Sequence, residues 1–476
     1  MGRVGTAGRS AGTRVRRIEA RVSPVHGRDR GDCRELGSVH ELFNLWQRMR
    51  VPYVNRPWEN RTMKTIVLGG GIVGVTTAYF LAKAGDEVTV IERRGGVALE
   101  TSFANAGLIA PGHSYTWASP RAPKILFKSL FADGQALRLK WTPDWRMWAW
   151  CGLFLQNCTA ERSRRNTSIK VRLCRYSQQR LQQATHDELL EYDRTSGGLL
   201  YLYRDPASFD RGVANMRILT DNGLPLEILD ARATIEREPA LRHAAGGIAG
   251  AIHCPTDESG DAHLFTRALA ERCRALGVEF RFDTSIDGVR ASADAIDYVE
   301  TSHGRVTGDR YVLALGSYSP IVARALGYRL PIYPVKGYSV TLPILDTHEP
   351  PALGGVEENQ LVAWARFGDR LRLTATAEFS GYDTTHSPGD FAHMLATAQA
   401  LFPNGADYST PSYWAGLRPM TPEGTPIIGA SRHRNLFFNT GHGHMGWTMS
   451  CGTAQIVADL IHGKRPDIDI TGMTLQ

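Results

Sequence analysis

The sequence predicts an α/β protein, α+β overall, in which a domain built on a parallel sheet is joined to a domain that contains antiparallel strands. Three observations favour this class. A glycine-rich turn lies between a short apolar strand and a helical apolar pattern. Residues 198–203 and 333–343 read as strands, and Gly368-Asp369 lies between two alternating runs, as in a hairpin. Residues 162–190 are rich in helix formers and lack the strand–helix alternation of a parallel sheet.

The length and composition are those of a globular protein of about two domains. The chain has 476 residues, of which 42% are hydrophobic and 22% charged, enough to bury a sizeable core. No run of about 18 apolar residues occurs, so no membrane-spanning helix is predicted. Seven cysteines occur without a CxxC pair, which predicts neither a disulfide framework nor a zinc site and favours a reducing, cytoplasmic setting.

The excess of positive charge is confined to residues 1–62. The whole chain has a formal net charge of +7, and residues 1–62 hold 13 Arg, no Lys and 6 acidic residues. Residues 63–476 are therefore neutral overall, which argues against a nucleic-acid partner. We expect residues 1–62 to be a disordered extension or the product of a wrongly chosen start codon, with the fold beginning at Met63. A basic nucleic-acid arm is the alternative, while the six acids argue against a targeting segment.

The first strand opens the full pattern of a Rossmann-like dinucleotide-binding unit. Gly69, Gly71 and Gly74 form G-x-G-x-x-G between strand and helix, and Glu92 ends the next strand, 23 residues after Gly69. The first glycine permits the tight turn, the second lets a pyrophosphate approach, and the third lets the helix pack closely. The helix N-terminus then faces negative charge, and an acid at this spacing suits a ribose hydroxyl.

The rest of the chain favours FAD over NAD. Residues 101–112 are small and polar without periodicity, which suits backbone contact with a flat ring, whereas an NAD enzyme would usually continue with alternating strands and helices. Residues 310–316 form an apolar strand that ends in glycine. Glycines at 441–446 precede a helix predicted over 447–461, whose N-terminus would stabilise negative charge on a reduced flavin.

Five segments together carry a more specific pattern, and they lie at residues 66–93, 100–107, 335–344, 413–429 and 439–454. They resemble the amine-oxidising FAD superfamily of D-amino acid oxidase and glycine oxidase, and most closely the small subunit of D-amino acid dehydrogenase. The resemblance covers Met63 to about Asp469. It implies FAD-dependent oxidation of a small D-amino acid to a 2-oxo acid and ammonia, with electrons passed to a quinone or respiratory acceptor. His444 departs from it, because a small residue such as Thr is expected there.

The resemblance also implies a discontinuous domain organisation, in which the chain crosses between two domains several times. The FAD-binding domain would comprise residues 63–112, 255–325 and 416–476. The substrate domain, built on an antiparallel sheet, would take residues 113–254 and 326–415.

Roles for individual residues follow from the same resemblance. Arg418 is the candidate that binds the substrate carboxylate, since a guanidinium offers a planar pair of donors that Lys cannot reproduce. Tyr338 and His444 are further candidates for substrate contact, each equally well explained as structural. His442 and His444 have the spacing of a metal pair, but no third ligand is evident and no metal is expected. The expected FAD contacts are Gly69, Gly70, Gly71, Ile72, Val73, Gly74, Glu92, Arg93, Ser102, Asn105, Gly316, Gly441, Gly443, Gly446 and Thr448.

Several alternatives stay open at this point. One is a glycine or sarcosine oxidase that yields hydrogen peroxide. Another is an RNA-modifying flavoprotein that uses residues 1–62 as an arm. The tryptophan-rich segment 141–155 reads either as core and interdomain anchors or as a surface that touches a membrane or a partner subunit. The expected location is the cytoplasm, with or without peripheral contact at the inner face of the cell membrane.

Overall fold

The computed structural model describes residues 62–129, 137–139 and 142–475. The expectations for residues 1–61 and for Trp141 therefore lie outside the described residues. From Thr62 onward the described chain forms one compact unit that contains two large sheets. The domain boundaries expected above stay predictions.

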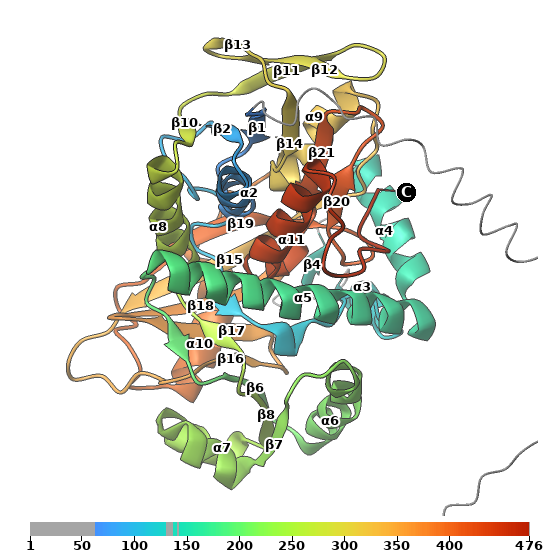
Figure 1. The fold of residues 1–476 in the computed structure, drawn as a ribbon. Coiled ribbons are helices and arrows are strands. Elements are labelled where there is room, and N and C mark those ends of the chain that lie inside the picture. The colour runs from blue at the N-terminus through green and yellow to red at the C-terminus, as the bar shows by residue number, and fades with distance from the viewer. Residues whose placement is uncertain (1–61, 130–136, 140–141, 476) are drawn as a thin grey trace, which may run out of the picture. The chain divides into compact units, whose positions relative to one another are not determined.

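The first sheet is parallel apart from one edge strand. Its β1 (Lys64–Leu68) pairs in parallel with β2 (Glu87–Ile91) on one side and β14 (Arg310–Leu313) on the other, as Figure 1 shows near the top of the view. All three strands were predicted from the sequence. The full order is β10-β2-β1-β14-β21-β20, with β10 (Glu279–Arg281), β21 (Leu436–Thr440) and the antiparallel β20 (Ile427–Ala430).

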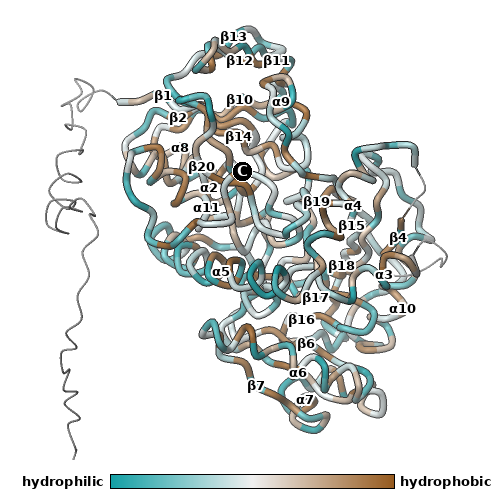
Figure 2. The backbone as a smooth tube through the Cα atoms, turned by 90° about the vertical axis from the view of Figure 1, so that its right-hand side faces the viewer, coloured by the Kyte–Doolittle hydropathy of each residue, from teal (hydrophilic) through white to brown (hydrophobic). Residues whose placement is uncertain are grey.

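Side chains of this sheet alternate between two apolar layers, because successive strand residues point to opposite faces. Val67 and Val90 pack under helices, whereas Ile66 and Leu68 contact the opposite layer. The tube in Figure 2 is correspondingly brown along these strands. The helices of the first layer are α2 (Ile72–Lys83), α5 (Ala160–Glu188), α8 (Ala262–Ala275) and α11 (Gly446–Ile461). The second layer holds α9 (Ser319–Ala325) and the three-stranded sheet of β11 (Ile286–Ala291), β12 (Ile296–Thr301) and β13 (Gly304–Val306).

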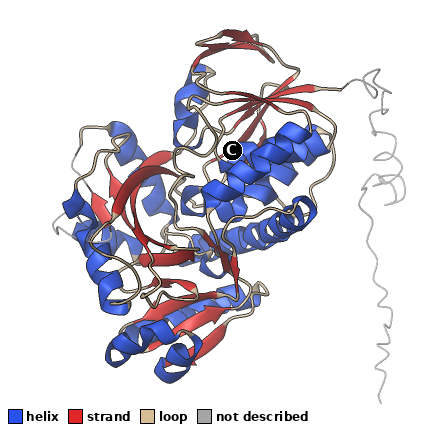
Figure 3. Ribbon diagram, turned by 90° about the vertical axis from the view of Figure 1, so that its left-hand side faces the viewer, coloured by secondary structure: helices blue, strands red, loops and turns tan. Residues whose placement is uncertain are grey.

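The second large sheet is mostly antiparallel and strongly curved, as the red strands in the middle of Figure 3 show. Its path runs β19-β15-β18-β17-β16-β6-β8-β7, and β4 pairs with β18 off this path. The strands are β4 (Leu137–Leu139), β6 (Leu199–Tyr203), β7 (Glu227–Asp230), β8 (Gly250–Cys254), β15 (Tyr333–Pro343), β16 (Gly354–Glu357), β17 (Val362–Phe367), β18 (Arg370–Phe379) and β19 (Ser412–Met420). The α-helices that contact it include α6 (Pro206–Asp221), α7 (Ala231–Arg237) and α10 (Ala392–Leu401).

Smaller elements join the two sheets. One is a three-stranded sheet of β3 (Leu108–Ile109), β9 (Glu258–Ser259) and β5 (Thr195–Ser196). In the sequence, β3 and β9 each lie between a strand of one large sheet and a strand of the other. Short 3-10 helices follow several strands: η1 (Pro111–His113), η2 (Pro239–Gly247), η3 (Gly316–Tyr318), η4 (Pro388–Phe391) and η5 (Gly443–Met445).

The tryptophan-rich segment forms α4 (Trp145–Asn157), which follows α3 (Ala122–Ser129). Trp150 and Phe154 are buried against β15 and β18, so this face of α4 is a core anchor as the first interpretation expected. Trp145, by contrast, is 68% exposed, and Leu155 is 45% exposed. Within the described ranges, no helix has the length and apolar character needed to cross a bilayer.

The predicted α+β class is confirmed, and the structure corrects one detail of it. The hairpin expected at Gly368-Asp369 joins β17 to β18, and the helix predicted over 447–461 is α11. The second sheet is not purely antiparallel, because β6 pairs in parallel with β16 and β4 in parallel with β18. A short apolar run such as 198–203 specifies a strand but not its partner, so these parallel pairs could not be predicted from it.

Candidate functional site

A cavity of about 530 Å³ lies at the carboxyl ends of β1 and β14 and against β15, β18 and β19 of the second sheet. Ligands of parallel α/β sheets bind at this end of the strands. Arg418, Tyr338 and His444 line the cavity, and so do twelve of the fifteen residues expected to contact the cofactor. The three that do not line it are Gly70, Gly74 and Gly441.

The glycine turn between β1 and α2 is as tight as the motif predicts. Gly69 has φ of +112°, a conformation that favours glycine, and a Cβ there would lie 2.7 Å from the Ala314 carbonyl oxygen. A Cβ at Gly74 would lie 1.8 Å from the Gly69 carbonyl oxygen. At Gly71, in contrast, the nearest atom to a Cβ would be Ser102 Oγ at 3.6 Å. The first and third glycines are therefore needed for packing, while the space beside the second faces the cavity.

Glu92 is fixed against this turn by two backbone donors. Its Oε2 accepts the Gly70 N–H at 2.7 Å, and its Oε1 accepts the Arg94 N–H at 2.8 Å. Burial raises the pKa of the Glu92 carboxyl, and these two hydrogen bonds oppose that rise. Glu92 therefore lies at the end of β2, on the cavity wall, as its spacing from Gly69 predicted.

Two helix N-termini face the cavity without a side-chain cap. Gly71 precedes α2 and Met445 precedes α11, and neither supplies a capping oxygen. The Ile72 N–H donates to Ser102 Oγ at 3.2 Å, and Thr448 Oγ1 accepts the Ala110 N–H at 3.2 Å. Uncapped amides and the positive ends of two helix dipoles suit anionic groups such as a pyrophosphate.

Three buried polar atoms of the cavity wall have no hydrogen-bond partner among the described residues. They are Asn439 Oδ1, His444 Nε2 and Trp447 Nε1. An unsatisfied buried polar atom costs about 1–3 kcal/mol, so folded proteins rarely keep one without reason. These three atoms belong to residues that line the cavity, so they are available to hydrogen-bond a polar ligand there.

Arg418 on β19 also lines the cavity, and none of the described carboxylates forms an ion pair with it. Its Nη1 donates to the Thr376 carbonyl oxygen at 2.8 Å and lies 3.5 Å from that of Lys336. Burial lowers the pKa of Arg418 to about 10, which still leaves it protonated at neutral pH. A guanidinium has five N–H donors, so most of them remain available to an anionic ligand.

The local backbone is shaped around this guanidinium. Where β15 pairs with β18 the register shifts by one residue, so Lys336 opposes Glu378 but Tyr338 opposes Ala375. Thr376 lies in this bulge with φ of +59°, and its carbonyl is the one that Arg418 binds. On the neighbouring strand a Cβ at Gly337 would lie 2.3 Å from Arg418 Cζ. A bulge and a strand glycine thus hold the guanidinium across β15, a use of bulges that is common at active sites.

Tyr338 does not direct its hydroxyl to a substrate in this structure. The hydroxyl donates to Glu378 Oε2 at 2.7 Å, and the ring packs edge-on against Phe391 in the core of the second sheet. Glu378 in turn pairs with Lys336 at 3.1 Å. These contacts favour the structural interpretation of Tyr338, because strand alternation points its side chain away from Gly337 and Arg418.

His444 and His442 follow β21 and have different surroundings. His444 stacks on Trp117, with ring centroids 5.0 Å apart. Burial lowers the pKa of His444 well below its ordinary value, and nearby Lys170, His113 and Arg418 act in the same direction. His442 lies within hydrogen-bond distance of Thr453 Oγ1 at 2.9 Å, and burial lowers its pKa to about 3. Both rings are therefore neutral, and no group of three metal-ligating side chains occurs among the described residues.

The remaining predicted contacts belong to loops around the cavity. Arg93 lies 3.9 Å from the Tyr318 ring centroid and pairs with Glu100. Asn105 Oδ1 accepts the Gly107 N–H at 3.0 Å. The turn glycines with positive φ are Gly316 (+53°), Gly441 (+76°) and Gly443 (+61°).

Gly337, Thr376, His113 and Trp117 line the cavity but were not predicted from the sequence as site residues. A glycine inside a strand is a known sign of close approach, so Gly337 could have been found. The bulge at Thr376 has no such signal. His113 and Trp117 follow the small-residue segment and reach the cavity only through tertiary packing.

Comparison with known proteins supports these observations. The model of the FAD dependent oxidoreductase family matches residues 64–460, and that of pyridine nucleotide-disulphide oxidoreductases matches residues 11–107. The chain is 43% identical over 412 residues to D-amino acid dehydrogenase 2 of Mesorhizobium japonicum, covering 86% of this chain and 99% of that one. It is 45% identical over 407 residues to D-amino acid dehydrogenase of Rhizorhabdus wittichii, covering 86% and 98%. Glycine oxidase from Geobacillus kaustophilus shares its fold, with a TM-score of 0.66 at 22% identity over 87% of this chain and 99% of that one.

We expect Gly74→Ala to lose bound flavin, because its Cβ would displace the Gly69 carbonyl and with it the start of α2. Overpacking of this kind costs roughly 1–3 kcal/mol. The measurement is flavin absorbance per protein after gel filtration, together with the thermal unfolding midpoint. Gly152→Ala in α4 is the matched control, since no atom lies within 4 Å of its added Cβ and it should stabilise the helix by about 0.5–1 kcal/mol. Wild-type flavin content in Gly74→Ala would contradict this account of the turn.

Proposed function

The chain belongs to the FAD-dependent oxidoreductase family, and on that premise we propose that it oxidises small D-amino acids to 2-oxo acids and ammonia. The observation that carries the substrate class is Arg418, a guanidinium in the cavity wall that no described carboxylate pairs with. Such a group calls for an anionic ligand, and an amino acid supplies a carboxylate of matching planar geometry. The preference for the D-enantiomer rests on the two relatives that are named D-amino acid dehydrogenases.

The residues of the cavity fit FAD. The uncapped start of α2 and the open space at Gly71 suit the pyrophosphate, Glu92 suits a ribose hydroxyl, and the uncapped start of α11 suits the polar edge of the flavin ring. When bound, FAD supplies the acceptor for the hydride that leaves the substrate Cα. We assign the remaining contacts to the other predicted residues of the turns, including Ser102 and Thr448.

The chain's own residues would orient the substrate. Arg418 holds the carboxylate, and the bulge at Thr376 fixes the guanidinium so that little reorganisation is needed on binding. His444 is neutral, so it adds no positive charge beside the substrate amine, and its unsatisfied Nε2 is available as a hydrogen-bonding group. After hydride departure, water hydrolyses the imino acid to the 2-oxo acid and ammonia.

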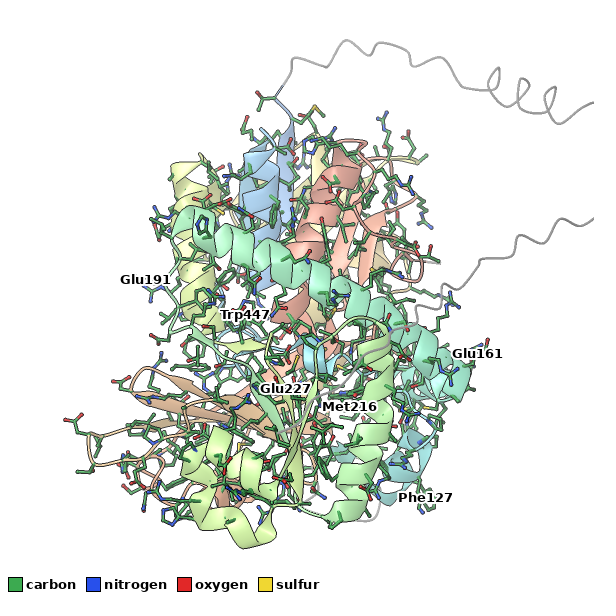
Figure 4. All side chains as sticks on the ribbon, turned by 60° about the horizontal axis from the view of Figure 1, so that its bottom comes forward. Phe127, Glu161, Glu191, Met216, Glu227 and Trp447 are labelled. Carbon is green, nitrogen blue, oxygen red and sulfur yellow. The ribbon has the colours of Figure 1, made fainter. Side chains whose placement is uncertain are left out.

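The electrons taken from the substrate must pass from FAD to an acceptor. We propose that this acceptor is a quinone of the membrane or another respiratory acceptor. The outer face of α3 and α4 supports membrane contact: Ile125, Trp145, Leu153 and Leu155 are 40–68% exposed. Exposed basic residues adjoin this apolar face in the chain: Arg121 just before α3, Lys124 in α3, Arg146 in α4, and Arg162, Arg164 and Arg165 at the start of α5. Apolar side chains with basic neighbours suit an anionic lipid surface. Figure 4 shows Phe127 of α3 and Glu161 of α5 at the outer edge of the same side of the molecule.

A glycine or sarcosine oxidase that yields hydrogen peroxide is the alternative. The likeness to glycine oxidase supports it only weakly, because 22% identity indicates the shared fold alone. The cavity gives no independent reason to prefer a substrate without a side chain.

We expect D-alanine to bleach the visible flavin absorbance of the purified protein under anaerobic conditions, because it reduces FAD. L-alanine, glycine and sarcosine are the comparisons, and a water-soluble quinone should restore the absorbance. Bleaching by glycine or sarcosine but not by D-alanine would contradict the proposal and favour the oxidase. Peroxide formation in air as fast as quinone reduction would contradict the proposed acceptor.

We expect the protein to sediment with anionic vesicles and not with neutral ones, and to be released by salt, because screening weakens the basic contacts. Trp145→Ser with Leu155→Ser should weaken sedimentation, whereas Ile228→Ser, at an exposed residue of β7, should not. Equal binding of both variants would exclude this face as the site of contact.

A further inference from the structure

Three histidines line the cavity, and they differ in whether a carboxylate accompanies them. His442 and His444 have pKa values lowered by burial, and no described carboxylate lies at either ring. His113, at the end of η1, is paired with Glu358, with Nε2 and Oε1 3.0 Å apart. Of these three, His113 alone has an acid that stabilises its protonated form.

The ring of His113 is held in one orientation. It stacks on Tyr201 with centroids 5.2 Å apart and an interplanar angle of 18°, and it meets Tyr115 edge-on at 6.1 Å. Nε2 is occupied by Glu358, which leaves Nδ1 as the nitrogen that no described residue hydrogen-bonds. An acid that orients one imidazole nitrogen and leaves the other for the substrate is the arrangement of a general base.

Charged groups from several elements act on His113. Burial lowers its pKa, but Glu358 outweighs burial, so the pKa of His113 lies above its usual value. Lys170 of α5 opposes Glu358, and Asp257 after β8 supports it. Asp257 accepts the Tyr201 hydroxyl at 2.5 Å and the Gly112 N–H at 3.0 Å, and burial raises its own pKa to about 7.

Oxidation of an amino acid at Cα requires the lone pair of the amine, which the ammonium form lacks. The carboxylate would be held by Arg418, whose charge also disfavours an ammonium nearby. A basic side chain in the same cavity would let the ammonium form bind and lose its proton there. His113, His444 and Arg418 all line this cavity, and the charges of His113 and Arg418 both lower the pKa of His444.

We propose that His113 accepts the proton of the substrate ammonium, with Glu358 stabilising the imidazolium that forms. The N–H bond of the substrate breaks, an N–H bond forms at Nδ1, and the amine keeps its lone pair. The proton passes to solvent once the product has left. This assignment rests on the proposed function, since it needs a substrate with an amino group.

Rapid-mixing measurement of flavin bleaching by D-alanine across pH tests the assignment in the full-length, FAD-loaded protein. Wild type should speed up as pH rises through the His113 pKa, because only the neutral ring accepts a proton. His113→Gln should be slower at neutral pH by on the order of 10²-fold. Its deficit should shrink as pH approaches the pKa of the substrate amine. The deficit should also be smaller with β-chloro-D-alanine, whose ammonium is more acidic.

Glu358→Gln is the second variant, and it should move the acid limb to lower pH because His113 loses its stabilising charge. His186→Gln, at an exposed histidine near the end of α5, is the matched control and should behave as wild type. A deficit of His113→Gln that is constant across pH, or an acid limb that stays at the same pH as in wild type, would overturn the assignment and point to structure or to Asp257. Absence of bleaching in wild type would instead overturn the proposed function.

Discussion

The site depends on the guanidinium of Arg418, which lines the cavity and forms no ion pair with any described carboxylate. Removing such a charge from water costs several kcal/mol unless a partner compensates it. Among the described residues, Arg418 hydrogen-bonds the backbone carbonyls of Thr376 and Lys336. The surrounding sheet is nevertheless arranged for it, since Gly337 leaves room and the bulge at Thr376 turns a carbonyl toward it. Positive φ at a non-glycine residue costs of order 1–3 kcal/mol, and such strain is typical of functional sites.

The topology explains how this side chain meets the nucleotide-binding unit. The parallel sheet directs the ends of β1 and β14 toward the cavity, and the second sheet brings β15, β18 and β19 to the same place. Glu92 and the uncapped starts of α2 and α11 adjoin the first sheet, whereas Arg418 lies on β19 of the second sheet. A cofactor and a carboxylate substrate would thus be held by different sheets, so each set of contacts can change with little effect on the other.

Much of the nucleotide-binding half could be predicted from the sequence, because its constraints are local. The turn at Gly69 to Gly74, the strand that ends at Glu92 and the helix over 447–461 are each specified by neighbouring residues. The surroundings of Arg418 were harder to predict, since their geometry depends on the register in which the strands of the second sheet pair. Tyr338 was a candidate for substrate contact, yet strand alternation directs its side chain into the core against Glu378. The pairing of His113 with Glu358 joins residues 245 positions apart, which no local pattern shows.

The most direct test of the central claim is a titration of the oxidised, FAD-loaded protein with propionate, a carboxylate without an amino group, followed by the flavin spectrum. Arg418→Gln should bind propionate on the order of 100-fold more weakly than wild type, since charged hydrogen bonds contribute about 1.5–3 kcal/mol. Propionamide, which lacks the charge, should bind both proteins equally weakly. Equal affinity of wild type and Arg418→Gln for propionate would contradict the claim that Arg418 binds the substrate carboxylate.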